Sequence, residues 1–557
     1  MSRLILFRIA ALIFLLVPGA VVKGMSDRAA EMNRVFETYN KNHYNMCGFH
    51  TIAHYLGLPE SNPTVKAILQ ARPIEDTSIV SPSGKFRIHF DTSGMNEPVL
   101  YNSNGQPEGG SAFAFADSVA NICDHVYYVE VDSLGFPPPA SDSGAGGGDE
   151  YDIYIEDLPL GEYGYTDWNS ALPIIQRANP TYATWTVIRN EFESTYTQGI
   201  PAMEVTIAHE FNHGIQVGNY GVWQDDLWFY ELTSTWMEQV VYPNVKDYFQ
   251  YLPDFFDNVS SKPFNFYNPF DFAGYERCVF GIFVQNAYGF KVMKSIWQDM
   301  SHEPVMPAIE DAFKADGVSP SAAFQLFSEW NYFTGYRAAL AEEFNVAAYP
   351  NASSYPRAGI EGDGALTNSG VTFSGLALPL TEHFFQVNDG PDTVGMAVSN
   401  NNFLAAVNGD TAQFPFSVGI SKDAVNCVKQ LSGGYCLFFN VHSFSDWSLV
   451  PFVSGQALVA ANDLAFPQPF NPSMDELKIP YPFTATSSAS LWIYDISGGL
   501  VDKLSGDASI VHYLRGSYFV WNGETLGGKK VGSGVYIYVV TDGSKSITGK
   551  IAVVRNQ

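Results

Sequence analysis

The pattern of hydrophobic and polar positions divides the chain into a mixed N-terminal part and a β-rich C-terminal part. Between residues 82 and 195, the segments Lys85–Phe90, Tyr151–Ile155 and Thr184–Ile188 have the composition and short length of strands. A helical pattern covers Ala112–Ile122. We therefore expect a small sheet with at least one helix packed on it.

The periodicity changes twice further along the chain. From Pro201 to about Phe344 it is helical, and after Pro350 it returns to short strands separated by Gly, Asn and Asp turns. Residues 365–455 predict one β-sandwich, and a second β-module runs from about residue 465 to the end. The predicted fold class is multidomain α+β, a small sheet with helices followed by two β-sandwich modules, with domains at 25–80, 82–350, 360–455 and 463–557.

The N-terminal segment 1–24 has the three-part plan of a secretory signal peptide. Arg3 and Arg8 flank the start of an apolar run, Ile9–Val17, and the small residues Gly19 and Ala20 follow it. No other stretch reaches the roughly 18 apolar residues of a membrane span. We expect export to the cell surface or medium, no membrane-spanning segment after signal removal, and a helical region at 25–80 that could be a pro-segment.

Charge and composition restrict the possible functions and folds further. The net charge is −28, from 58 acidic and 30 basic residues, which disfavours binding to nucleic acid. Hydrophobic residues make up 46% of the chain, enough to build real cores. Five cysteines in 557 residues do not make a disulfide scaffold.

One segment carries the pattern of a metal site. Residues 209–213 read His209-Glu210-Phe211-Asn212-His213, inside an apolar helical stretch. Positions i and i+4 lie on one face of a helix, so both imidazoles can bind one zinc ion. The glutamate after the first histidine can then act as a general base toward a water on the metal.

A catalytic zinc needs a third protein ligand and an open fourth position. Residues 225–238 predict a second helix, in which Trp228, Leu232 and Trp236 form an apolar stripe. Glu231, Thr235 and Glu238 lie along another face of this helix, where a carboxylate would meet the two histidines. Both glutamates are therefore candidates for the third ligand.

The spacing of these motifs resembles that of the gluzincin clan of metallopeptidases. The interval from His213 to Glu231 is similar to the one in that clan, and residues 228–236 resemble the W-x-x-E-x-x-[AS]-x-[WY] helix of thermolysin-like and aminopeptidase-like enzymes. The resemblance implies a zincin-like catalytic domain with zinc held by His209, His213 and Glu231, and with Glu210 as the catalytic carboxylate. At the level of motifs it covers about 70 residues, and the region 82–345 looks similar to secreted bacterial metallopeptidases.

The same resemblance points to a tyrosine. Residues 275–278 read Tyr-Glu-Arg-Cys, where the aminopeptidase-like branch has Y-x-K-G, and Tyr275 would then stabilise the oxyanion. Cys278 departs from that pattern, and Tyr248, Tyr251 and Tyr267 are competitors. The G-x-M-x-N motif that binds a free substrate amine in that branch is missing, which favours an endopeptidase.

The C-terminal region, from about position 465 onward, resembles a second known module. Residues 465–473 open this region, and the segments 491–498, 520–523 and 532–538 follow, in which strands alternate with Gly and Asn turns. In order and spacing they resemble the immunoglobulin-like module of flagellar hook-cap proteins and the C-terminal sorting domains of type IX secretion cargo. The resemblance implies contact with export machinery or the cell envelope.

We therefore expect a secreted zinc endopeptidase that acts on proteins or peptides. A cell-surface adhesion or scaffold protein with a degenerate peptidase domain stays open, as does a zinc hydrolase of non-peptide amides. The Cys47 thiolate could occupy the fourth zinc position and silence a precursor, although a buried thiol is the simpler interpretation. Asp149, Glu150 and Asp152 in an acidic loop are candidates for calcium, without EF-hand spacing.

Overall fold

The structure is a computed structural model, which describes residues 47–58, 61–159, 161–177, 179–268, 274–343 and 347–365, most of 31–38, and parts of 371–453 and 470–555. The predicted signal peptide lies outside the described residues. The chain forms two compact units, the first comprising residues 1–251 and 267–308 and the second comprising residues 252–266 and 309–557. Both helices and sheets are present, so the multidomain α+β class is confirmed.

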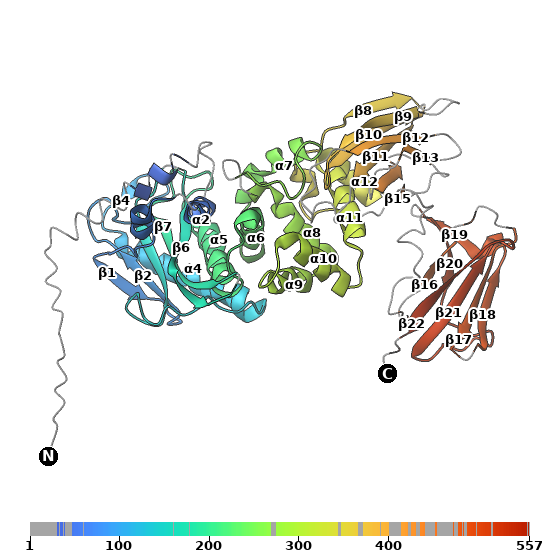
Figure 1. The fold of residues 1–557 in the computed structure, drawn as a ribbon, viewed down its shortest axis with the longest axis horizontal. Helices are drawn as coiled ribbons and strands as arrows, with labels where there is room; N and C mark the ends of the chain where they lie inside the picture. Colours follow the sequence, from blue (N-terminus) through green and yellow to red (C-terminus); the bar gives the residue numbers. More distant parts are fainter. Residues whose placement is uncertain are drawn as a thin grey trace, which may run out of the picture. The chain divides into compact units, whose positions relative to one another are not determined.

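The first unit is built on a mixed five-stranded sheet with the order β1-β2-β5-β7-β6 (Figure 1). Strands β2, β5 and β7 run parallel to one another, whereas β1 pairs antiparallel with β2 at one edge and β6 pairs antiparallel with β7 at the other. The three predicted strands are confirmed as β2, β5 and β7. The bounds are β1 Thr77–Val80, β2 Phe86–Phe90, β5 Tyr151–Glu156, β6 Gly164–Ile175 and β7 Thr181–Arg189, with a small separate hairpin of β3 Leu100–Tyr101 and β4 Pro107–Glu108.

Two of these strands correct the sequence analysis. Residues 77–80, which we assigned to a helical region, form edge strand β1. Strand β6 was not predicted at all, because its sequence places Asp167 and Asn169 among aromatic and small residues and does not alternate cleanly. As an edge strand, β6 leaves one row of backbone groups available to another segment.

Helices α4 and α5 lie side by side against this sheet (Figure 1). The predicted helices around 112–122, 205–213 and 225–238 are confirmed as α4, α5 and α6. Pro201 sits in the first turn of α5, where a missing N–H costs nothing. The helices of this unit are α2 Phe49–Gly57, α3 Pro63–Leu69, α4 Ala112–Tyr127, α5 Ile200–Asn219, α6 Leu227–Val241, α8 Cys278–Tyr288 and α9 Phe290–Asp299.

The second unit begins with helices and continues into sheets. Its helices are α7 Leu252–Asn258, α11 Pro320–Tyr332 and α12 Ala338–Glu343, and α10 Val305–Ala315 spans the boundary between the units. Strands β8 Gly362–Ala365, β10 Glu382–Asp389, β11 Asp392–Ser399, β14 Tyr435–Asn440 and β15 Phe452–Val453 form one sheet, and β9 Val371–Ala377, β12 Phe414–Ile420 and β13 Val425–Lys429 form another. The Phe373 ring on β9 stacks on the Phe385 ring on β10 at 4.8 Å, so the two sheets face each other.

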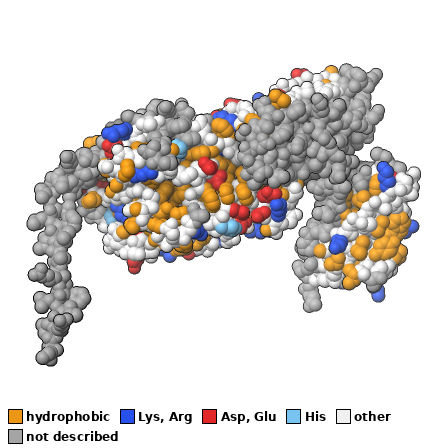
Figure 2. All heavy atoms as spheres, in the orientation of Figure 1, with side chains coloured by type: hydrophobic (Ala, Val, Ile, Leu, Met, Phe, Trp, Pro, Cys, Tyr) orange, Lys and Arg blue, Asp and Glu red, His pale blue; other side chains and the backbone are white. Residues whose placement is uncertain are grey.

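The C-terminal residues form two further sheets around an apolar core. One sheet has the order β16-β20-β19 and the other β18-β17-β21-β22. Leu491, Ile493 and Trp521 are among the buried residues of this core. Figure 2 shows hydrophobic side chains on the visible surface of this part of the chain, and Val535 and Ile537 on β21 are exposed. The bounds are β16 Leu477–Pro480, β17 Ser490–Asp495, β18 Leu500–Ser505, β19 Ile510–Tyr513, β20 Gly516–Trp521, β21 Gly534–Thr541 and β22 Ser546–Val553. Among the described residues, no helix is long and apolar enough to cross a bilayer.

Candidate metal centre

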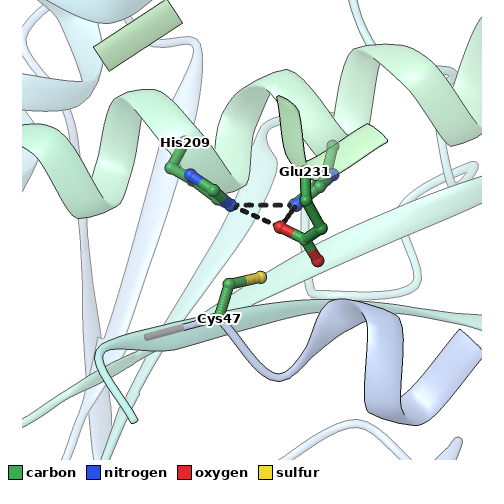
Figure 3. Close-up of side chains that lie close together, drawn as sticks. Cys47, His209 and Glu231 are labelled. Atoms are coloured by element: carbon green, nitrogen blue, oxygen red, sulfur yellow. Dashed lines mark hydrogen bonds and ion pairs between the residues drawn. The ribbon is translucent and has the colours of Figure 1, made fainter. Parts of the chain in front are cut away.

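Helices α5 and α6 bring the three predicted ligands to one point. His209 Nε2 lies 3.1 Å from His213 Nε2, and Glu231 Oε2 lies 3.0 Å and 3.3 Å from these two nitrogens (Figure 3). All three side chains are buried. The helical spacing of the histidines and the packing of α6 on α5 together produce this convergence.

These distances fit a zinc ion. Zinc bonds of about 2.0–2.1 Å to imidazole nitrogen and carboxylate oxygen place the atoms of a tetrahedral ligand set about 3.3 Å apart. The three measured separations of 3.0–3.3 Å are close to this value. The Cys47 sulfur completes a cluster of four ligand atoms that all lie within 4.8 Å of one another. Two imidazoles, one carboxylate and one thiol are a donor set typical of zinc.

The far nitrogens of both histidines are held by other side chains of the same two helices. His209 Nδ1 lies 2.7 Å from Glu238 Oε1, and His213 Nδ1 lies 2.7 Å from Gln216 Oε1. A proton on each Nδ1 can be donated to these oxygens, which leaves the Nε2 lone pairs for a metal. The structure thus places Glu238, our alternative ligand, behind His209 in a position to orient its ring.

The pKa shifts of two of the three proposed ligands, His209 and Glu231, favour the protonation states that bind a cation. Burial lowers the pKa of His209 to about 4, so its imidazole is neutral near pH 7. Burial would raise the pKa of Glu231, but the charge of His213 and hydrogen bonds from His209 and His213 outweigh it and hold the pKa well below its ordinary value. For His213, burial lowers the pKa, but Glu231 raises it by more. A metal ion would compete with a proton for this imidazole, as expected for imidazole ligands.

Glu210 lies on the side of α5 that faces strand β6. Its Oε2 accepts a hydrogen bond of 2.9 Å from Thr166 Oγ1, which is on β6. Burial raises the pKa of Glu210 to about 7, although His213 and a hydrogen bond with Cys47 oppose that increase. A carboxylate with a pKa near neutrality can both take up and return a proton.

The N-terminal segment at the start of α2 also reaches the centre. His50 Nδ1 lies 3.3 Å from Glu231 Oε1, and the Phe49 ring stacks on His213 with centroids 4.0 Å apart. Burial, then the nearby Glu210 and Glu231 carboxylates, raise the pKa of the Cys47 thiol well above its ordinary value. Sequence reasoning weighed Cys47 but missed His50, since no spacing rule relates residue 50 to a helix so distant in the chain.

Tyr275 is placed at the same centre. It begins a short 3₁₀ turn, Tyr275–Arg277, that leads into α8, and its hydroxyl donates a 3.0 Å hydrogen bond to the Cys47 carbonyl oxygen. The Tyr251 ring stacks on Tyr275 at 5.0 Å. Among the tyrosines considered from the sequence, Tyr275 and Tyr251 line the small cavity next to His209 and Glu210, to which Tyr163 also contributes.

The acidic loop that we considered for calcium contains several paired carboxylates. Asp152 contacts Arg72 at 2.5 Å and His89 at 2.8 Å, and Glu150 contacts Arg87 at 3.0 Å. The Arg72 and Arg87 guanidinium groups thus pair with two of the three carboxylates that we considered for calcium.

Comparison with known proteins yields little. No family model and no curated protein matches the chain. Parts of it are similar to PorZ, an essential bacterial surface component of the type-IX secretion system of Porphyromonas gingivalis, at 17% identity over 32% of this chain and 30% of that one, with a TM-score of 0.14. Dimeric latent PorU from the same organism is similar at 17% identity over 35% of this chain and 19% of that one, with a TM-score of 0.15. The chain spans less than a third of either structure, and such scores do not define a shared fold.

Proposed function

We propose that the chain is a zinc-dependent endopeptidase with a zincin-like catalytic domain, in which His209, His213 and Glu231 hold the metal. The observation that carries the proposal is the convergence of three buried ligand atoms at mutual distances of 3.0–3.3 Å. The donor set favours zinc, and we include no calcium in the proposal.

Zinc at this centre would polarise a substrate carbonyl and lower the pKa of a water molecule. Glu210 is the base in this chemistry: its carboxylate takes the proton of the attacking water and returns it to the leaving amine. Thr166 holds Oε2 of Glu210, which fixes the direction of the carboxylate. Tyr275 supplies a hydrogen bond to the oxygen of the tetrahedral intermediate, since its hydroxyl already binds a carbonyl oxygen beside the centre.

We also propose that the chain is exported. The support is the charged, apolar and small-residue plan of the N-terminal segment 1–24, together with the resemblance of the C-terminal module to sorting domains. The two sheets around the apolar core at the C-terminus suit a small β-sandwich of the kind that this resemblance implies. The C-terminal module would then contact export machinery or the cell envelope, and the substrate would be an extracellular protein or peptide.

The mechanism is tested with Glu210→Gln, in the wild-type chain and in a Cys47→Ser chain, because the sulfur lies beside the centre. With zinc bound, we expect kcat/KM on a fluorogenic peptide library to fall about 10³-fold, the scale of a lost general base. Glu204→Gln, a half-buried position on the same helix, is the matched control and should retain activity. Equal hydrolysis by the Glu210→Gln and Glu204→Gln variants would contradict the proposed role of Glu210.

A further inference from the structure

The segment that precedes α2 lies along the edge of the sheet, directly over the candidate metal centre. Cys47 forms a parallel bridge with Gly164 on β6, and the Gly48 N–H donates a 2.9 Å hydrogen bond to the Gly164 carbonyl. Strand β6 is at the edge of its sheet, so this is the row of backbone groups that an added peptide would use. A segment of the chain itself thus occupies a place suited to a bound peptide.

The side chain of Cys47 points into the ligand cluster. Figure 3 shows its sulfur directed at His209 and Glu231, and all four ligand atoms of the cluster lie within 4.8 Å of one another. The thiol and the Glu210 side chain also line the same small cavity. A water that attacks a substrate would need the same two neighbours, the metal ligands on one side and the basic carboxylate on the other.

The backbone of Cys47 makes the contact expected of a substrate. Its carbonyl oxygen accepts the 3.0 Å hydrogen bond from Tyr275, the residue that we propose for the oxyanion. The cavity that Cys47, His209, Glu210 and Tyr275 line has a volume of about 10 Å³. This volume holds roughly one water molecule and leaves no room for a peptide beside the thiol.

Neighbouring residues fix the segment in this position. Phe49 stacks on His213, and His50 contacts the second oxygen of Glu231. A Cβ atom at Gly48 would come within 2.6 Å of the Phe36 ring, so glycine allows the backbone to approach this closely. Both sides of the segment are therefore packed, and the thiol is buried.

We propose that Cys47 is a fourth protein ligand of the metal and that residues 47–50 keep the enzyme latent. This inference rests on the proposed function. When the sulfur binds, the S–H bond is replaced by a sulfur–metal bond, and the Glu210 carboxylate, which lines the same cavity, accepts the proton. Activity then requires withdrawal of Cys47, after which water can take the vacated position.

The test uses zinc-loaded full-length chain as wild type, Cys47→Ser and Cys123→Ser. Cys123 is a buried thiol on α4 and serves as the matched control. X-ray absorption at the zinc edge of the wild type and of Cys123→Ser should detect one sulfur at about 2.3 Å, absent in Cys47→Ser. Peptide hydrolysis should rise at least about 10-fold in Cys47→Ser and remain unchanged in Cys123→Ser, since a site open at most about a tenth of the time keeps only about a tenth of its full activity.

The outcomes separate this inference from the proposed function. Zinc bound by nitrogen and oxygen only in the wild type would overturn the role of Cys47 and leave a zinc centre intact, even if Cys47→Ser fails to fold. Sulfur ligation without any gain of activity in a folded Cys47→Ser chain would overturn latency. A wild-type chain that binds no zinc would overturn the proposed function itself, and with it the inference.

Discussion

The helix pair α5–α6 of the first unit and the C-terminal sheets of the second unit bury different kinds of side chain. The described residues 470–553 enclose a core of apolar and aromatic side chains, such as Leu491 and Trp521. Helices α5 and α6 bury His209, His213 and Glu231 beside their apolar residues. Burying charged groups costs free energy unless partners compensate, so this arrangement is stable only as a connected network.

Two buried glutamates, Glu231 and Glu382, illustrate how the surroundings of a buried carboxyl group set its pKa. Glu231 is surrounded by imidazoles, and its pKa is lowered well below the ordinary value. Glu382 on β10 is equally buried, but its neighbour is the neutral Asn331 amide, and burial raises its pKa to about 8. Burial alone therefore marks a protonated structural carboxyl group, whereas burial among imidazoles marks a centre prepared for a cation.

The largest effect on stability should come from the apolar core. Leu491→Ala on β17 removes a fully buried side chain and should lower the free energy of unfolding of this region by about 2–5 kcal/mol. Zinc affinity should be unchanged, because the core lies in the other compact unit. Chemical denaturation and zinc titration of the same sample measure both quantities, with the exposed Val535→Ala as control. A parallel loss of zinc affinity would show that the two regions are not independent.

A smaller effect should appear in the pH dependence of the second unit. The pKa of Glu382 is raised from 4.5 to about 8, so the folded state holds a proton that the unfolded chain releases above pH 4.5. Its stabilising contribution is complete below pH 4.5 and is lost as the pH rises toward 8. Each pKa unit corresponds to about 1.4 kcal/mol, so a loss of a few kcal/mol is expected.

The measurement for Glu382 is urea denaturation at several pH values between 4.5 and 8. Glu382→Gln imitates the protonated form and can still bond to Asn331, so its stability should vary less with pH than that of the wild type. Identical pH profiles for the two proteins would mean that Glu382 is ionised in the folded state.

The smallest effect should come from the residues behind the ligands. Glu238→Gln weakens the partner of His209 Nδ1 without removing a ligand, and should reduce zinc affinity about 10–100-fold. Competition with a chelator measures this change, and Gln239→Glu, next in sequence on α6, is the control. A loss of zinc as complete as that from a ligand variant would instead place Glu238 on the metal.

Hydrophobic periodicity along the sequence predicted the helices of the metal centre. It could not predict contacts between segments that are distant in the sequence. The spacing of His209 and His213 is a property of one helix, and the apolar stripe of α6 indicated the face that carries Glu231 and Glu238. The choice of Glu231 came from the resemblance to a known clan. Strands β2, β5 and β7 also followed from short apolar segments. Tyr275 required the resemblance to a known clan in addition.

Contacts that depend on tertiary structure were missed. His50 and Thr166 reach Glu231 and Glu210 only after α2 and β6 have packed against the helices. Strand β6 lacks the alternation of a half-buried strand, so neither it nor its pairing with Cys47 could be derived from periodicity. Cys47 was recognisable as a thiol able to bind zinc, but its position depends on that pairing.

The central claim is that His209, His213 and Glu231 bind zinc, and elemental analysis of purified wild type and His213→Ala tests it most directly. We predict one equivalent of zinc in the wild type and its loss in the variant, because His213 is one of the two imidazole ligands of the proposed centre. No zinc in either protein, even when zinc is supplied during folding, would contradict the claim and favour a surface-binding role for the chain.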